Sequence, residues 1–351
     1  MGYSKTNHKQ ILAILSLMVA TLIFVSSWEP LTYKRNSFLT ETNKMNLASK
    51  RDELEVALEK ASMANKTVII AFVNKAYVEP NDAEYPTMFD LFLEGFWVGD
   101  DTRRLLSHLL VVSMDTTAHQ RCLFRRLNCY RMAAEDDGLA GEKFFMSAGF
   151  LEMMWRRTSF LIQVLNKGYS FIFTDIDILW LRNPFTRLVT NADESMDLQI
   201  STDEFDDDAS STRIRINTGF YFIKSNNKTT SLFQRWYDTR TNSGGVKEQD
   251  VLQNLVRHGI LAQLGIKIKF LNTIYFSGFC KFSLGDFRFV ATVHATCCRG
   301  IPAKVLDLKD VLRNWKRFRE AESFSVPTNT TNNFRGIVHG ACSNSWIKKI
   351  S

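Results

Sequence analysis

Short apolar runs recur along the chain between stretches of mixed polarity, and each run is typical of a strand buried on both faces. The runs predict strands at residues 67–73, 109–114, 169–174, 218–224, 266–271 and 287–294. Gly219 falls at the start of the fourth of these strands. Apolar positions three and four residues apart predict helices at 50–64, 150–166 and 248–258.

Local signals support the helices and indicate how they combine with the strands. Leu54, Leu58 and Ala61 fall on one face of the first helix, and Gly168 provides a stop for the second. Alternation of strands and helices is typical of an α/β domain. We therefore predict a mainly parallel sheet flanked by helices.

The longest uncharged run, residues 11–28, is of a different kind. Eighteen helical residues span about 27 Å, which is close to the thickness of a bilayer core. Lys5 and Lys9 precede the run and Glu29 follows it, so the positive-inside rule predicts a cytosolic N-terminus and a lumenal remainder. A cleaved signal peptide is the alternative, although the run is longer than a usual signal core and bulky Trp28 follows its small residues.

These patterns divide the chain into five parts. They are a cytosolic tail (1–10), a transmembrane signal anchor (11–28), a stalk with the leading helix (29–64), the α/β domain (65–322) and an irregular C-terminal tail rich in Thr and Asn (323–351). His339 and Cys342 lie in the last part, and the sequence suggests no role for them.

Composition agrees with a lumenal address. The 351 residues carry a formal charge of +7 but no dense Lys/Arg block with interleaved aromatics, so a nucleic-acid polymer is not a favoured partner. Sequons occur at Asn65, Asn227 and Asn329.

Six cysteines permit disulfides in an oxidising compartment. Cys122 and Cys129 are near enough in sequence for a local pair, and Cys280 can pair with either Cys297 or Cys298. No C-x-x-C pair exists, so a structural zinc site is excluded.

The stretch most informative about chemistry follows the predicted strand 169–174. Asp175 and Asp177 come directly after this strand, and Pro184 then ends regular strand pairing. The two aspartates are therefore expected at the sheet edge where open α/β sheets bind ligands. Two carboxylates can hold Mg²⁺ or Mn²⁺ and leave positions open for a diphosphate. A phosphatase of the haloacid-dehalogenase type also uses D-x-D, but its motif continues to Thr or Val where this chain has Leu179.

Several segments together resemble the plant nucleotide-diphospho-sugar transferase family, placed in glycosyltransferase family 77. They are FIFTDIDILWLRNP (171–184), MMWRR (153–157), NTGF (217–220), KSNN (224–227), QDVL (249–252) and VHATCC (293–298). The resemblance extends over residues 67–318. It implies a Rossmann-like GT-A fold, a single-pass type II Golgi membrane protein, and sugar transfer with retention of anomeric configuration. Members act on plant cell-wall polymers or hydroxyproline-rich glycoproteins, commonly with pentose donors.

The resemblance assigns metal-binding roles to residues of this chain. Asp177 is expected to bind Mn²⁺ or Mg²⁺ directly, Asp175 to bind the metal or the donor ribose and sugar, and His294 is suggested as a third ligand. The alternative for His294 is a structural histidine at a strand end.

Other positions are candidates for contacts with the UDP-sugar. Asn74 and Lys75 follow the first strand, on the side that usually binds the nucleotide, or they form a surface turn. Arg156 or Arg157 either reaches the diphosphate, braces an aspartate, or lies on a solvated helix face.

Two further pairs lie on the predicted sugar side. Asn217 and Gly219 allow the backbone to approach the sugar, or form a bulge. Gln249 and Asp250 are predicted catalytic residues that line the sugar and acceptor side of the cleft, although Asp250 could instead cap its helix. The acidic segment 203–208 is expected to be a solvated loop, with a lid or an acceptor contact as the alternative.

The mechanism expected from these assignments is metal-dependent transfer to a glycan or glycoprotein acceptor. The acceptor hydroxyl attacks from the face that UDP leaves, and a donor phosphate oxygen takes its proton. The alternatives are a non-catalytic lumenal binding or scaffolding protein with the same fold, and the D-x-D phosphatase.

Overall fold

The structure is a computed structural model that describes residues 52–80, 86–132, 141–189, 196–205, 214–280, 286–323 and 339–347. The predicted cytosolic tail, the anchor, most of the stalk and the third sequon, at Asn329, lie outside these ranges. Among the described helices, none combines the length and apolarity that a membrane span requires.

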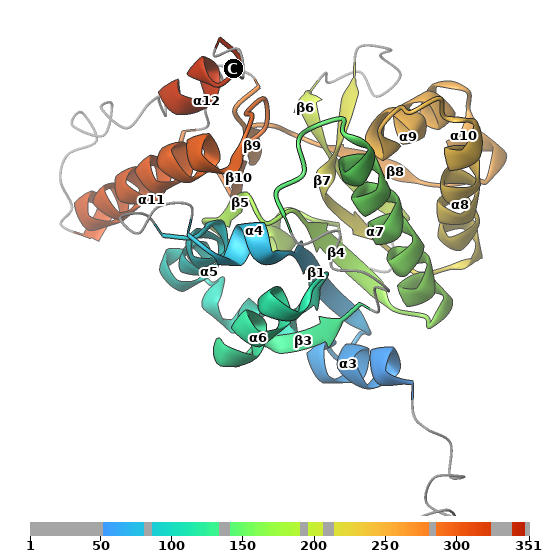
Figure 1. The fold of residues 1–351 in the computed structure, drawn as a ribbon, viewed down its shortest axis with the longest axis horizontal. Helices are drawn as coiled ribbons and strands as arrows, with labels where there is room; N and C mark the ends of the chain where they lie inside the picture. Colours follow the sequence, from blue (N-terminus) through green and yellow to red (C-terminus); the bar gives the residue numbers. More distant parts are fainter. Residues whose placement is uncertain are drawn as a thin grey trace, which may run out of the picture. The chain divides into compact units, whose positions relative to one another are not determined.

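A seven-stranded sheet forms the centre of the domain, in the order β3-β2-β1-β4-β7-β6-β8 (Figure 1). Its strands are β1 Thr67–Val73, β2 Leu109–Ser113, β3 Asn128–Arg131, β4 Ser170–Thr174, β6 Leu198–Glu204, β7 Arg215–Ile223 and β8 Ile268–Leu271. Only β7 runs against its neighbours, and the other four strand pairs are parallel. The prediction of an α/β domain with a mainly parallel sheet is confirmed.

A smaller sheet of three strands carries the residues that follow Asp177. It contains β5 Ile178–Trp180, β9 Phe276–Gly278 and β10 Thr292–His294, in the order β5-β10-β9. Because β10 is antiparallel to β5, His294 pairs with Ile178, the residue immediately after Asp177.

Helices cover both faces of the large sheet. The described α-helices are α3 Glu53–Ala61, α4 Lys75–Val78, α5 Met88–Val98, α6 Thr116–Phe124, α7 Ala148–Asn166, α8 Asn227–Asp238, α9 Glu248–Arg257, α10 Ile260–Gln263, α11 Ile301–Ser323 and α12 Gly340–Asn344. The 3-10 helices are η1 Arg103–His108, η3 Pro184–Thr186 and η4 Thr239–Asn242.

Alternate side chains of β1 point into two separate cores, as the two-residue period of a strand requires. Ile69 packs in a core with α5, α6 and α11, whereas Ile70 packs in a core with α3, α7, α8 and α9. Figure 1 shows α5 and α11 on one side of the sheet and α7 and α8 on the other.

Several element boundaries differ from the predictions. Strand β7 begins at Arg215, so Gly219 lies in its middle rather than at its start. The last strand is limited to Thr292–His294, because the backbone oxygen of Asp286 accepts hydrogen bonds from Phe289 and Val290 in a turn.

Further helices lie at the two ends of the domain. Helix α3 buries Leu54, Leu58 and Ala61 as its pattern predicts, and it belongs to the same compact unit as the sheet, Glu53–Ser351. The predicted irregular tail contains α12, whose Cys342 is buried. Tertiary contacts override the weak local signal there.

All six cysteines form disulfides. The pairs Cys122–Cys129 and Cys280–Cys297 match the predictions, while Cys298–Cys342 was not anticipated. This third bond joins the loop after β10 to α12.

Candidate active site

A cavity of about 320 Å³ opens beside the carboxyl ends of β1 and β4. Its lining includes Asn74 and Tyr77 after β1, Asp175 and Asp177 after β4, and His294 at the end of β10. This is the edge at which ligands bind in open α/β sheets, and the volume lies at the lower end of the range for ligand sites.

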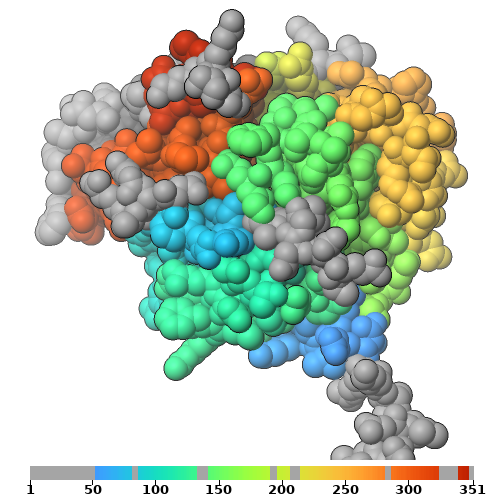
Figure 2. Space-filling model, viewed as in Figure 1, coloured from blue at the N-terminus to red at the C-terminus, as the bar shows by residue number. Residues whose placement is uncertain are grey.

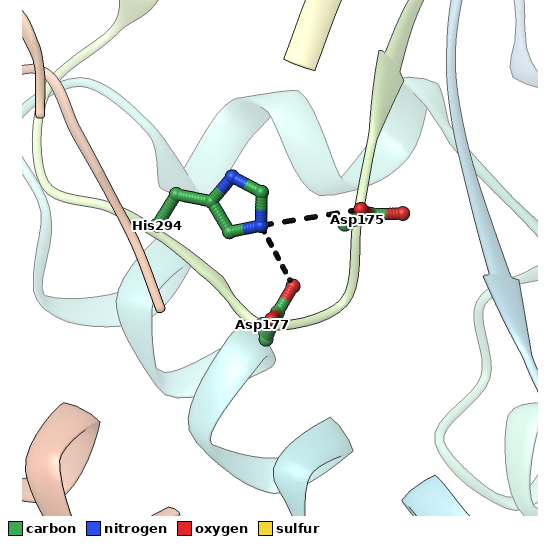
Figure 3. A group of neighbouring side chains, drawn as sticks. All are labelled: Asp175, Asp177 and His294. Carbon is green, nitrogen blue, oxygen red and sulfur yellow. Dashed lines mark ion pairs between the residues drawn. The ribbon is translucent and has the colours of Figure 1, made fainter. Parts of the chain in front are cut away.

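Asp175, Asp177 and His294 each offer a ligand atom within 4.8 Å of the others (Figure 3). His294 Nε2 lies 3.3 Å from Asp177 Oδ1 and 3.9 Å from Asp175 Oδ2. Backbone hydrogen bonds hold the group together, since Asp175 N donates to Gly219 O at 2.6 Å and Ala295 N donates to Asp177 O at 3.1 Å.

Gly219 lies directly beneath this cluster. A Cβ at that position would lie 2.3 Å from His294 Cε1 and 2.8 Å from Asp175 Oδ2. Any larger residue would therefore displace one of the two side chains. Gly219 also lies in an irregularity of the β6–β7 register, between Asn217, which pairs with Ser201, and Tyr221, which pairs with Ile200, so the bulge given as the alternative is present.

A buried arginine braces Asp175. Arg157 Nη1 donates to Asp175 Oδ1 at 2.7 Å, Arg157 Nη2 lies 3.4 Å from Glu248 Oε1, and the guanidinium packs over the Phe173 ring. Burial raises the pKa of Asp175 and of Glu248, and it outweighs the opposing charge of Arg157.

Lys304 of α11 supplies a second positive charge, next to Asp177. Its Nζ donates to Asp177 Oδ2 at 2.7 Å. Burial alone would raise the pKa of Asp177, but Lys304 and His294 hold that pKa well below its usual range. Burial also raises the pKa of Tyr77 to about 12, so this phenol stays protonated at neutral pH.

The donor set fits a divalent cation. Two carboxylates and one imidazole converge on one point, and the missing side chain at Gly219 leaves that point open on the backbone side. Hard oxygen ligands with one imidazole suit Mn²⁺ and also Mg²⁺. The low pKa of Asp177 keeps one ligand ionised.

The two residues predicted after β1 have separate positions. Asn74 is buried, lines the cavity and donates from Nδ2 to Gly141 O at 3.1 Å. Lys75 is not among the lining residues; its half-exposed side chain pairs with Glu79 at 3.5 Å. The structure thus places Asn74 at the cavity and Lys75 on the surface.

Asn217 lines the cavity and connects two of its walls. Its Oδ1 accepts from Gly219 N at 2.8 Å, and its Nδ2 donates to Asp203 Oδ1 at 2.8 Å. Burial raises the pKa of Asp203. The expectation that segment 203–208 is solvated is wrong at Asp203, which lines the cavity; residues 206–208 lie outside the described ranges.

The first turn of α9 contributes Glu248 and Gln249 to the cavity, but not Asp250. Gln249 Oε1 accepts from Thr218 N at 3.1 Å. Asp250 is half-exposed and lies 3.9 Å from Lys247, because each helical step rotates the side chain by about 100°. The structure thus brings Glu248, two residues earlier, to the cavity and leaves Asp250 outside its lining.

A similar step separates the two arginines of α7. Arg156 pairs with Glu152 at 2.7 Å on the solvated face, the alternative given for it, and it is not among the residues that line the cavity. Arg157 makes the brace instead. Sequence reasoning also missed Lys304, Tyr77 and Trp346 as lining residues.

Comparison with known proteins agrees with this geometry. A family model described as nucleotide-diphospho-sugar transferase matches residues 104–308. An uncharacterized protein of Arabidopsis thaliana is 52% identical over 84% of each chain. Two relatives from the same plant are more distant. The beta-arabinofuranosyltransferase RAY1 is 22% identical over 61% of this chain and 37% of its own length. The UDP-D-xylose:L-fucose alpha-1,3-D-xylosyltransferase 3 is 24% identical over 50% of this chain and 45% of its own.

The D-x-D cluster at a strand end, the matched family model and the extensive identity to a plant relative point the same way. This chain therefore belongs to the nucleotide-diphospho-sugar transferase family and is a glycosyltransferase.

Proposed function

We propose that the protein transfers a pentose from a UDP-sugar to a cell-wall polysaccharide or glycoprotein acceptor, in a GT-A fold of glycosyltransferase family 77 and with retention of configuration. The convergence of Asp175, Asp177 and His294 in the cavity carries the proposal. The arabinofuranosyl- and xylosyltransferase relatives support a pentose donor.

Asp175, Asp177 and His294 would hold Mn²⁺ or Mg²⁺. Such an ion neutralises the charge that develops on a diphosphate leaving group.

The chain's own residues then have distinct tasks. Arg157 fixes the orientation of Asp175, and Lys304 keeps Asp177 ionised at the cavity floor. Gln249 is held by Thr218 on the side where the sugar would lie, and Asn74 lies beside the carboxyl end of β1, towards the nucleotide.

The transfer itself exchanges one C–O bond for another. The bond from the sugar C1 to the diphosphate oxygen breaks, and a bond from C1 to the acceptor oxygen forms. The acceptor hydroxyl loses its proton to an oxygen of the departing phosphate. No side chain needs to change its net protonation over the cycle.

A Golgi lumenal location is part of the proposal, with residues 11–28 as a type II signal anchor and residues 1–10 in the cytosol. Pairing of all six cysteines supports an oxidising compartment. Asn65 and Asn227, the two described sequon asparagines, are exposed and accessible to N-glycosylation.

The test is UDP release by the full-length protein from UDP-xylose, UDP-arabinofuranose and UDP-galactose, with and without Mn²⁺ and without acceptor. We expect slow, metal-dependent release by the wild type, and a loss of at least about 100-fold in Asp177→Ala. Asp310→Ala, which removes an exposed carboxylate of α11, is the matched control and should retain activity.

Two results would contradict the proposal. Equal UDP release in Asp177→Ala would exclude the metal site. Binding of donor without any release, by the wild type, would favour the scaffolding alternative, and metal-dependent phosphate release from simple monoesters would favour the phosphatase.

A further inference from the structure

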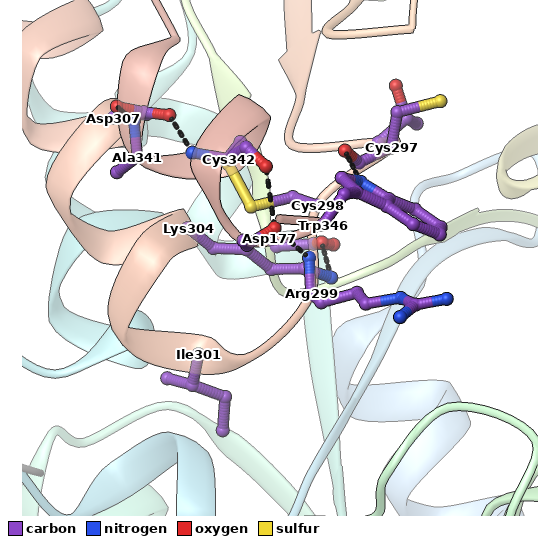
Figure 4. The surroundings of a disulfide bond; sticks show 12 residues. Asp177, Cys297, Cys298, Arg299, Ile301, Lys304, Asp307, Ala341, Cys342 and Trp346 are labelled. Atoms are coloured by element: carbon purple, nitrogen blue, oxygen red, sulfur yellow. Dashed lines mark hydrogen bonds and ion pairs between the residues drawn. A yellow bond between two sulfur atoms is a disulfide. The ribbon is translucent and has the colours of Figure 1, made fainter. Parts of the chain in front are cut away.

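The C-terminal helix α12 is attached to the domain at two points close to the cavity (Figure 4). Cys342 forms a disulfide with Cys298, four residues after His294. Asp307 of α11 is buried, and its carboxylate accepts from the backbone N–H of Ala341 at 3.2 Å and of Cys342 at 2.8 Å. Both contacts fix the same end of α12.

This attachment brings Trp346 to the cavity, of which it is a lining residue. Its Nε1 donates to Cys297 O at 2.6 Å, and the Arg299 guanidinium lies over its ring at 3.9 Å. The backbone N–H of Arg299 donates to Ser345 Oγ at 2.9 Å. Trp346 is therefore held at Nε1 and by the guanidinium over its ring, although the residue is 48% exposed.

Figure 2 shows the orange residues of α11 beside the green residues that lead into α7. A hydrogen bond confirms this contact, since Ile301 N donates to Glu142 Oε1 at 2.9 Å. Phe145, in the segment after Glu142, also lines the cavity and is 52% exposed. The rim of the cavity thus carries exposed aromatic rings, while its floor carries buried charges.

The chemistry of this rim differs from that of the floor. An indole offers a flat apolar surface, and Arg299 offers N–H donors; within the described residues no carboxylate forms an ion pair with that guanidinium. A saccharide ring presents C–H groups on one face and hydroxyl groups at its edge. An aromatic face next to free donors matches both.

We propose that Trp346 and Arg299 form the subsite for a neutral saccharide ring of the acceptor, and that the Cys298–Cys342 disulfide and Asp307 position this subsite. The inference rests on the proposed function. The acceptor is assigned to this rim because it is the exposed side of the cavity, whereas Asp177, where the diphosphate would be neutralised, is only 5% exposed.

The test compares Trp346→Ala and Trp346→Phe with wild type, in the full-length protein. Binding is measured by saturation-transfer NMR with methyl α-L-fucopyranoside, methyl β-D-galactopyranoside, methyl α-L-arabinofuranoside and short arabino-oligosaccharides, without donor. We expect at least one saccharide to bind, with about a tenfold or greater loss in Trp346→Ala and at most about a threefold loss in Trp346→Phe. Metal-dependent UDP release without acceptor is measured in parallel. In Trp346→Ala, the loss of UDP release should be at least tenfold smaller than the loss of saccharide binding.

Trp97→Ala is the matched control. Trp97 is 54% exposed and has Arg103 over its ring at 4.2 Å, yet it is not among the residues that line the cavity. Its replacement should change neither measurement. A Cys298→Ala/Cys342→Ala variant should reduce saccharide binding while Trp346 remains in the sequence.

Several results would overturn the inference. One is unchanged saccharide binding in Trp346→Ala. Another is a parallel loss of UDP release in that variant, which would assign Trp346 to the donor. The third is absence of saccharide binding by the wild type. Failure of the proposed function is seen separately, as absence of metal-dependent UDP release by the wild type. Trp346-dependent saccharide binding without donor would still stand in that case.

Discussion

At the residue scale, the neighbouring arginines 156 and 157 have the same chemistry and opposite environments. One step of α7 turns Arg157 into the domain, where it meets Asp175 and Glu248, and leaves Arg156 in solvent with Glu152. Sequence reasoning identified a brace for an aspartate but could not choose between the two, because helical phase relative to the sheet is set by packing.

Replacement of the two arginines should reduce the stability of the protein by different amounts. Arg157→Ala leaves the buried carboxylate of Glu248 and the partly exposed carboxylate of Asp175 without their cation, and should destabilise the protein by about 3–5 kcal/mol. Arg156→Ala removes an exposed pair and should cost about 0–1 kcal/mol. Urea unfolding followed by tryptophan fluorescence measures both, and equal costs would contradict the assigned environments.

Gly219 gives a second prediction at this scale. In Gly219→Ala the new methyl group would meet His294 and Asp175, so UDP release should fall by about 100-fold through misplacement of these side chains. Gly149→Ala is the control, since its methyl group would face only the flexible side chain of Lys143 at 3.2 Å. Full activity in Gly219→Ala would show that the cluster tolerates displacement.

At the element scale, the strands that are apolar throughout were predictable. Strand β1 has the predicted bounds, β2 and β4 are each one residue shorter, and α7 ends where Gly168 adopts a positive φ. Strand β6 was missed because it buries polar residues, among them Gln199, whose side chain bonds to the Val189 backbone. Helix α12 has five residues and depends on Asp307 and a disulfide, which no local pattern reveals.

Asp197 joins three elements and predicts a pH-dependent contribution to stability. Its carboxylate accepts from Asn226 of the α8 cap, Lys228 of α8, and the backbone of Lys267 before β8. Burial raises its pKa, but these hydrogen bonds outweigh burial, and the net pKa is lower than usual.

Because the folded-state pKa is the lower one, the stabilisation is complete above the unfolded-state pKa of about 4 and is lost as the pH falls through the folded-state value. Asp197→Asn should therefore cost about 1–3 kcal/mol at pH 7, and less below about pH 4. Urea unfolding over pH 3–7 measures the difference. A cost that stays constant down to pH 3 would contradict the assignment, and Asp310→Asn provides an exposed reference.

At the scale of the whole molecule, the candidate site combines residues that are far apart in sequence. The D-x-D pair was visible as a motif, and His294 through its flanking residues. Arg157, Glu248 and Lys304 come from three helices and meet only in the folded domain, so their spacing in sequence carries no signal.

The extent of the domain gives a prediction at the same scale. Leu54 and Leu58 are 1% and 0% exposed in the core that also contains α7, so α3 is part of the domain. Burial of each leucine contributes about 1.5–3 kcal/mol, against a total stability of about 5–15 kcal/mol.

A chain that begins at residue 65 should therefore unfold at a clearly lower temperature than one that begins at Asp52, or fail to fold. Thermal unfolding followed by circular dichroism of the two chains measures this. Equal midpoints would show that α3 is dispensable and that the boundary expected from the sequence is correct.

Cys297 and Cys298 are adjacent and belong to different disulfides, one to Cys280 and one to Cys342. If Cys280 and Cys342 exchanged partners, the resulting isomer would have the same mass and no free thiol. In that isomer the Trp346 side chain would be displaced. Ellman titration and intact-mass spectrometry cannot separate this isomer from the native protein. The appropriate quality control for a recombinant preparation is therefore peptide mapping in which the peptide bond between Cys297 and Cys298 is cleaved, so that the partner of each cysteine is identified separately.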